Sequence, residues 1–280
     1  MSSHNKSCVD VVYAWCGLPE NKTCKFTKDI VYSLRSVKKY IKWIRRIWII
    51  VDDIVTDIDL ENGGIDLNDP IIHVVRYKDF IPTKYLPITW NSNVVESWIW
   101  KIQELSDKFI YFCDDMYVGK TCTIDMFFYK DFPIVRINRG PPNHSVTVKV
   151  KGNDYVDMWQ NAITEHNIHY TRLVHNCMPY RKSLMKKYYA TYKNEIHAAS
   201  SNSVRSGKKD FNLLRFSGSL SVMHGDAMLL ATDPINVDYF VESSNKKAIA
   251  NILIIKPQFF CINNTSRKQK WVYDTLEKLF

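Results

Sequence analysis

Runs of apolar residues divide the first half of the chain into short strands and amphipathic helices. Four of these runs are rich in β-branched and aromatic residues and predict buried strands at Val9 to Trp15, Arg46 to Val51, Ile71 to Val75 and Lys108 to Cys113. Between the first two, the segment Thr27 to Tyr40 places Ile30, Leu34 and Val37 on one face, which predicts a helix.

A second helix is predicted from Asn93 to Leu105. Asn93 and Glu96 have the spacing of a capping box at its start. Its apolar side is formed by Val95, Trp98, Ile99, Ile102 and Leu105. Apolar strands that alternate with helices are typical of a mostly parallel sheet covered on both faces. The expected fold class is therefore α/β, with a Rossmann-like sheet.

The apolar pattern becomes weaker after Phe132. We expect a loop or hairpin at residues 139–152, mainly helical structure at 154–232, a strand in KPQFFCINN and a last helix from Lys270 to Leu279. Together these predict a single domain over residues 1–280. Its α/β core would take in about 8–138 and 250–280, with a mainly helical insertion at about 150–240 and a C-terminal strand and helix that close the core.

The charge balance narrows the classes of partner. Lys and Arg number 38 against 29 Asp and Glu, which gives a net charge of +9 and a pI of about 9.0. This balance favours anionic partners such as phosphorylated small molecules, nucleic acid or acidic membranes, although a solvated basic surface explains it equally well. The basic residues are dispersed and form no aromatic-interleaved stripe or known binding motif, so no nucleic-acid partner is expected.

Cysteine usage and the N-terminus bear on the compartment. The 7 cysteines include no C-x-x-C pair, which argues against a disulfide framework and a zinc ribbon. The first residues, MSSHNKSCVD, contain no apolar signal region, and no apolar run approaches the roughly 18 residues that span a bilayer. We therefore expect reduced cysteines, no membrane span and a cytoplasmic location.

Polar residues follow several of the predicted strands. They are Asp52 and Asp53 after WIIV, Asp114 and Asp115 after KFIYFC, and Asn263 and Asn264 after FFCI. Ligands of open α/β sheets bind at the carboxyl ends of strands. Adjacent carboxylates raise each other's pKa unless a cation compensates, and Mg²⁺ accepts one or two carboxylates together with phosphate oxygens. The alternative is a simple turn in which an Asp caps the backbone.

Three further residues have both a catalytic and a structural interpretation. His175 in LVHNCMPY is either a catalytic base or a structural histidine. Arg205 in SVRSGKKDFN could clamp a phosphate or simply cover a helix surface. Asp210 opens DFNLLRF and could equally be a helix N-cap.

Taken in order, these blocks resemble those of the Stealth family, which includes the catalytic subunit of lysosomal-enzyme N-acetylglucosamine-1-phosphotransferase and bacterial capsule polysaccharide polymerases. The matching segments are DVVYAW at Asp10 to Trp15, Tyr32 to Asp53, Asp79 to Lys120, HNCMPY with VRSGKKDFNL, and PQFFCINN. The second block is long and specific, whereas the first and last are short.

The resemblance implies a GT-A-like fold and a phosphotransferase reaction. An acceptor hydroxyl would attack the β-phosphate of a nucleotide sugar, such as a UDP-N-acetylhexosamine, in the presence of Mg²⁺ or Mn²⁺. The sugar-1-phosphate would pass intact to a glycan or glycoconjugate, as in polysaccharide biosynthesis for a capsule.

The same resemblance implies roles for individual residues. The implied catalytic residues are Asp115, His175 and Arg205. The implied metal ligands are Asp114, Asp115 and Asn264, with Asp115 as an alternative acceptor of the hydroxyl proton. The implied substrate-binding residues are Asp10, Arg35, Asn91, Asn93, Asp210 and Asn263.

Several positions depart from the family pattern. They are Cys16-Gly17, Trp100-Lys101, Cys113 before the Asp pair, Cys177, and Asn264 where an Asp is usual. Cys113 and Asn264 leave open a degenerate member that binds a sugar or nucleotide without turnover. A metal-dependent glycosyltransferase that attacks the anomeric carbon is a second alternative, and a basic nucleic-acid-binding protein is a third.

Overall fold

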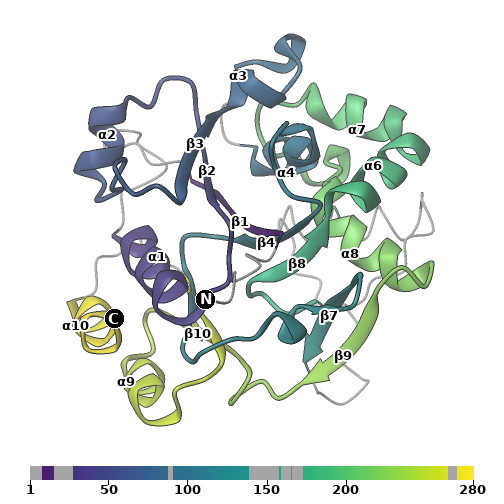
Figure 1. Ribbon diagram of the computed structural model, residues 1–280. Helices are drawn as coiled ribbons and strands as arrows, with labels where there is room; N and C mark the ends of the chain where they lie inside the picture. Colours follow the sequence, from purple (N-terminus) through teal and green to yellow (C-terminus); the bar gives the residue numbers. More distant parts are fainter. Residues whose placement is uncertain are drawn as a thin grey trace, which may run out of the picture.

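A five-stranded sheet in the order β3-β2-β1-β4-β8 forms the centre of the protein (Figure 1). The computed structural model describes residues 8–15, 28–87, 91–138, 158, 165, 173–263 and 270–280. The strands are β1 (Val9–Ala14), β2 (Ile47–Val51), β3 (Ile72–Arg76), β4 (Lys108–Phe112) and β8 (Met178–Arg181). The first four run parallel and β8 runs antiparallel to β4. The predicted α/β class and the four predicted strands are confirmed.

Helices cover both faces of this sheet (Figure 1). On one face lie α1 (Asp29–Tyr40) and α2 (Asp57–Asn62). On the other lie α4 (Ser92–Trp98), α6 (Lys182–Thr191), α7 (Lys193–Ser200) and α8 (Leu213–Met223). Alternation along β1 explains the two layers, because Val11 and Tyr13 pack toward α1 whereas Val12 packs toward α4 and α8.

Two smaller sheets lie beside the central sheet (Figure 1). One has the order β10-β11-β5, with β5 at Met116–Val118, β10 at Asp238–Glu242 and β11 at Phe259–Asn263. The other has the order β6-β7-β9, with β6 at Phe128–Tyr129, β7 at Phe132–Asn138 and β9 at Met228–Thr232. The helices α9 (Lys246–Ile255) and α10 (Lys270–Leu279) pack on the first of them around Tyr117, Phe260 and Ile262.

The remaining short helices are α3 (Tyr77–Phe80), η1 (Thr83–Tyr85), η2 (Ile99–Lys101), η3 (Ile124–Met126) and η4 (Gly207–Lys209). Among the helices that the structure describes, none has the length and apolar character needed to cross a bilayer.

The start of α4 differs from the predicted capping box. Asn91 is the N-cap, and its side-chain oxygen accepts from the backbone N–H of Asn93 at 3.2 Å. Asn93 cannot cap the helix because its own side chain is buried against Asn212. The helix also ends earlier than predicted, at Trp98, and tightens into η2. The predicted apolar side from Val95 to Leu105 is confirmed as part of the core.

The second half of the chain contains more strand than predicted. Within about 150–240, α6, α7 and α8 are helical, but β8 joins the central sheet and β9 pairs with β7. The predicted hairpin at 139–152 lies outside the described residues. The last helix, Lys270–Leu279, is confirmed.

A close backbone contact holds β5 beside the start of β11. The N–H of Gly119 donates to the carbonyl of Gln258 at 2.9 Å. A Cβ at position 119 would lie 2.1 Å from the carbonyl oxygen of Pro257, so only glycine permits this approach. The contact fixes the strand that follows the Asp114–Asp115 pair.

Candidate active site at the carboxyl edge of the central sheet

Asp114 and Asp115 are the two central residues of the turn that joins β4 to β5. The N–H of Met116 donates to the carbonyl of Cys113 at 3.3 Å, which closes the turn. The carbonyl of Asp115 accepts from the N–H of Ile262 at 3.1 Å, so the turn is also tied to β11. The turn interpretation is therefore correct, and the turn itself brings both carboxylates to the carboxyl edge of the sheet.

A cluster of three potential ligands forms beside this turn. Asp115, His175 and Cys261 each offer a side-chain donor atom, and these atoms all lie within 4.8 Å of one another. His175 comes from the segment before β8, and Cys261 comes from β11. One carboxylate oxygen of Asp115 is buried and has no hydrogen-bond partner in the described part of the chain. Such an oxygen is a site for a cation or a donor from substrate.

Burial and neighbouring charge shift the pKa values of the carboxylates. The pKa of Asp114 is raised by burial, then by the charges of Asp115 and Asp29. Burial also raises the pKa of Asp115, although a hydrogen bond with Cys261 opposes that rise. Asp29 is the first residue of α1, is buried, and was missed in the sequence. The three carboxyl groups thus disfavour one another's ionised forms, which a divalent cation would stabilise.

The imidazole of His175 is exposed in the cluster and is neutral at pH 7. Protein atoms around the ring and the positive charge of Arg215 lower its pKa to about 4. Phe240 packs edge-on against the ring at 5.6 Å. A neutral imidazole can accept a proton at pH 7, so the role of catalytic base stays a prediction for His175. The same imidazole could also bind a metal, a role that the sequence did not suggest.

The donor set fits a divalent cation through oxygen and nitrogen. Carboxylates suit Mg²⁺ and Mn²⁺, and imidazole is a common ligand of transition metals. Burial raises the pKa of the Cys261 thiol well above its usual range, so this group stays protonated and donates to Asp115. Cys261 therefore orients the carboxylate of Asp115. No motif around Cys261 in the sequence predicts this role.

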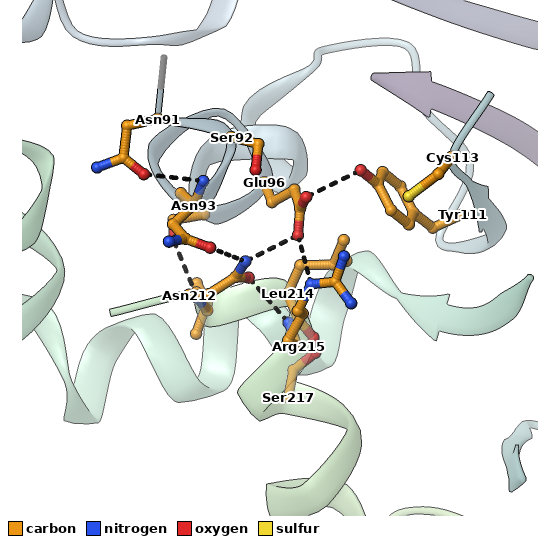
Figure 2. Close-up of polar contacts among 12 residues, drawn as sticks. Asn91, Ser92, Asn93, Glu96, Tyr111, Cys113, Asn212, Leu214, Arg215 and Ser217 are labelled. Atoms are coloured by element: carbon orange, nitrogen blue, oxygen red, sulfur yellow. Dashed lines mark hydrogen bonds and ion pairs between the residues drawn. The ribbon is translucent and has the colours of Figure 1, made fainter. Parts of the chain in front are cut away.

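A buried network links helix α4 to β4 and to the start of α8 (Figure 2). The Glu96 carboxylate is 2% exposed and accepts from the hydroxyl of Tyr111 at 3.0 Å. It also accepts from Asn212 Nδ2 at 2.7 Å and from Arg215 Nε at 3.1 Å. Asn212 in turn donates to Asn93 Oδ1 at 2.9 Å. Both carboxylate oxygens of Glu96 therefore accept hydrogen bonds, which fix the positions of Tyr111, Asn212 and Arg215.

Arg215 brings positive charge to the site. Its charge helps to lower the pKa of His175, and it opposes the rise that burial causes at Asp115 and Cys113. These effects require the guanidinium to lie near all three groups. Sequence reasoning missed Arg215 because Glu96, its partner, lies 119 positions earlier in the chain.

Three predicted residues gather instead at the start of α4. Asn91 Nδ2 donates to Asp210 Oδ1 at 3.1 Å, and the N–H groups of Ser206 and Gly207 donate to Asp210 Oδ2 at 2.9 and 3.1 Å. Arg205 is exposed and donates to the hydroxyl of Ser92. Asp210 is buried and orders the loop that carries Arg205, so it supports this region without facing solvent.

Asp10 is not brought to the site. It lies at the amino end of β1, opposite the edge that carries Asp114, and is 0% exposed. Arg45 donates to both of its oxygens at 2.9 and 2.6 Å, and Trp48 Nε1 and the N–H of Ser106 each donate at 2.9 Å. The predicted substrate contact is corrected: this carboxylate is saturated by the fold.

In the described part of the chain, Arg35 has no ion pair or hydrogen bond with the cluster, so its predicted substrate contact stays a prediction. It lies on the outer side of α1, pairs with Glu277 of α10 at 3.3 Å and stacks over Tyr32. Asn263 ends β11 on the same face as Cys261, and its amide donates to Glu242 at 2.9 Å. Asn264 lies outside the described residues.

The comparisons with known proteins agree on one family. Conserved region 2 of the Stealth proteins matches residues 24–135. The capsular polysaccharide phosphotransferase LcbA of Aeromonas hydrophila is 30% identical over 256 residues, which cover 86% of this chain and 67% of that protein. The capsular polysaccharide phosphotransferase fcs1 of Haemophilus influenzae is 29% identical over 271 residues, covering 88% and 68%.

This chain therefore spans about two thirds of the length of those two relatives. Among solved structures, the WbbM bifunctional glycosyltransferase in its apo form shares the fold with a TM-score of 0.52 at 9% identity, over 100% of this chain and 51% of that one. The identity and coverage of the LcbA match, together with the conserved-region match, show that the chain belongs to the Stealth family.

Proposed function

We propose that this chain is a catalytic domain that transfers sugar-1-phosphate from a nucleotide sugar to a hydroxyl of a glycan acceptor. The observation that carries the proposal is the cluster in which Asp115, a neutral His175 and the charge of Arg215 meet at one edge of the sheet. Its relatives are named capsular polysaccharide phosphotransferases, which agrees with this chemistry.

His175 is the proposed general base. Its neutral imidazole takes the proton of the acceptor hydroxyl as that oxygen bonds to the β-phosphorus. The bond between this phosphorus and the bridging oxygen breaks, and the nucleoside monophosphate leaves with the bonding electrons. The sugar-phosphate bond stays intact, so the product is a phosphodiester.

Arg215 and Arg205 are the proposed diphosphate contacts. Arg215 is oriented by a buried carboxylate, Glu96, which fixes its side chain before substrate arrives. Arg205 is exposed on the loop between α7 and η4, beside Ser92 at the start of α4, and would be the second contact to the donor diphosphate. Phosphoryl transfer depends chiefly on positioning and charge neutralisation, which are the tasks that both arginines suit.

Asp114 and Asp115 are the proposed ligands of Mg²⁺ or Mn²⁺, with Asn264 as a further predicted ligand. A bound divalent ion supplies charge neutralisation at the diphosphate. Asp115 offers the unpartnered buried oxygen and is oriented by the Cys261 thiol. Cys113, which stands where the family usually has Asn, is partly buried beside this pair and supplies no charge at neutral pH.

A glycosyltransferase remains the second candidate, because the fold is shared with one such enzyme. The two reactions are separated by the fate of the β-phosphorus. With donor labelled at that atom, phosphotransfer places the label on the acceptor. Its recovery in released nucleoside diphosphate would instead establish the glycosyltransferase.

The direct test is a donor screen with a panel of nucleotide sugars in Mg²⁺ or Mn²⁺, reading out released nucleoside monophosphate. Asp115→Asn should abolish release, by about 10³-fold or more if the carboxylate holds the metal. Asp125→Asn is the matched control, because Asp125 is an exposed aspartate of η3 outside the site. Equal rates for the Asp115 variant and the parent would refute the assignment.

A further inference from the structure

A recess lies on the sheet face that carries α4 and α6. It has a volume of about 810 Å³ and lies between α3, η2 and the start of α6. Four lysines line it: Lys78, Lys101, Lys182 and Lys186. None of the roles proposed above uses any of them.

The charge of this lysine recess is not cancelled by its two aspartates. Asp107 is committed to the N–H of Ser183 at 2.8 Å and to Arg181 at 2.7 Å, and Asp79 caps α3 by accepting from the N–H of Arg76. Within the described part of the chain, Lys78, Lys101 and Lys186 are exposed and form no ion pair with a carboxylate. An excess of positive charge in a concave surface attracts anions.

Lys182 also lines the recess, but its ammonium is used in hydrogen bonds within the protein. Its ammonium donates to the carbonyls of Ile102 and Gln103 at 2.6 and 3.0 Å, so it closes the end of η2. Burial lowers its pKa, which shows that the ammonium is partly withdrawn from water. The charges available to a ligand are therefore those of Lys78, Lys101 and Lys186.

The recess also offers an aromatic surface. Trp100 lines it and packs against Tyr189 at a ring distance of 4.8 Å. Its indole Nε1 is buried and has no hydrogen-bond partner among the described residues. Lys101 Nζ lies 5.8 Å from the Trp100 ring, so charge and aromatic face adjoin. Aromatic faces beside polar donors bind amphipathic ligands whose one side is apolar.

The position of the recess relates it to the active site. Asp107 in its wall directly precedes β4, whereas Asp114 follows the other end of that strand. Five residues of strand separate the two ends by about 17 Å. The recess is thus a separate site, within reach of a ligand several sugar units long.

We propose that the lysine recess binds the phosphodiester-linked glycan that the active site extends. This rests on the proposed function: each transfer of sugar-1-phosphate leaves one phosphodiester, which carries a negative charge at neutral pH. Exposed lysines would contact these phosphates, and the indole of Trp100 would contact a sugar ring. Nucleic acid is disfavoured because the basic groups are confined to one local recess, whereas duplex or single-strand binding uses a basic track that follows several nucleotides.

The test measures binding to the whole chain without nucleotide sugar. The probe is a fluorescent hexamer of N-acetylglucosamine joined by phosphodiesters, compared with the neutral hexamer and with hexathymidylate. Lys101→Gln with Lys186→Gln should weaken binding of the phosphodiester hexamer by about tenfold, the effect of losing two exposed charge contacts. Lys247→Gln with Lys278→Gln, on the exposed sides of α9 and α10, removes equal charge and should change binding less than about twofold. Trp100→Phe keeps an aromatic face, removes the N–H donor and should give a smaller loss.

Three results would overturn the proposal: equal losses in both lysine pairs, equal affinity for the neutral hexamer, or tighter binding of hexathymidylate. Donor turnover separates this failure from that of the proposed function. If nucleoside monophosphate is released normally but the lysine variants bind the hexamer as the parent does, only the proposal for the recess is refuted. If binding depends on the lysines but the chain turns over no donor, only the proposed transferase function is refuted.

Discussion

Replacing Glu96 by Gln should both destabilise the fold and weaken donor binding. Gln keeps the size of the side chain but removes the negative charge that holds Arg215 Nε at 3.1 Å and Asn212 Nδ2 at 2.7 Å. The amide nitrogen would then face Tyr111, whose hydroxyl can rotate to accept. The loss is one charge-assisted contact in a site that is 2% exposed, so unfolding should become easier by about 2 kcal/mol.

Glu96→Ala should cost more than Glu96→Gln. It leaves the N–H of Asn212 and the hydroxyl of Tyr111 without their acceptor, and it leaves Arg215 without its ion pair. Each buried unpaired donor costs about 1–3 kcal/mol, so we expect a total of about 4 kcal/mol. Urea unfolding at pH 7 measures both variants. The surface variant Glu104→Gln is the control, because the ion pair of Glu104 with Arg46 is exposed and should contribute below about 1 kcal/mol.

A measurement of donor KM shows whether Glu96→Gln misorients Arg215 or only lowers the free energy of unfolding. At a temperature where the parent and Glu96→Gln are both folded, the KM for donor should rise about tenfold, equivalent to ~1.4 kcal/mol. A double-mutant cycle with Arg215→Gln should give a coupling of about 1 kcal/mol or more. The reasoning would be refuted if the free energy of unfolding of Glu96→Gln lay within about 0.5 kcal/mol of the parent value and its KM for donor were unchanged.

Three further predictions concern the fold around the site. Arg136→Met should destabilise by about 3–5 kcal/mol, because it leaves Asp238 charged and buried without the Nε contact at 3.1 Å, and the double variant with Asp238→Leu should recover part of that loss in urea unfolding. Gly119→Ala should cost about 3 kcal/mol through the clash with the Pro257 carbonyl, seen as a lower melting temperature; an unchanged melting temperature would contradict the close contact. Burial raises the pKa of Asp107, but the hydrogen bonds from Ser183 and the charge of Arg181 outweigh burial, and the net effect is a lowered pKa. The free energy of unfolding of the parent should therefore exceed that of Asp107→Asn fully above about pH 4, and this difference should disappear as the pH falls through the folded-state pKa.

Local periodicity was enough to predict the parts of the fold that depend on one segment at a time. The strands of the central sheet are continuous apolar runs, and the final helix has the right period, so both were found. The strands β5 and β9 were missed because they pair with partners far along the chain, and β9 has mostly exposed residues. Helix α4 was predicted too long because the chain tightens into η2 after Trp98. The ammonium of Lys182 then satisfies the carbonyls of Ile102 and Leu105 outside the helix.

The candidate site shows the same division. Asp114 and Asp115 were identifiable because their position after an apolar strand is a local signal. Asp10 had an equally visible position, but its use by Arg45 and Trp48 depends on contacts that no short pattern reveals. Arg215 and Cys261 were missed for the same reason, because each acquires its role from a partner more than a hundred positions away.

The tie between the Asp115 carbonyl and the N–H of Ile262 has a consequence for biosynthesis. The ribosome delivers the chain from its N-terminus, and Asp115 emerges long before β11 has been made. The turn that carries the carboxylates cannot acquire its final neighbours, Ile262 and Cys261, until β11 has been synthesised. Assembly of the candidate site therefore has to wait for β11 during co-translational folding, and a nascent chain arrested before β11 would hold a formed central sheet without a complete site.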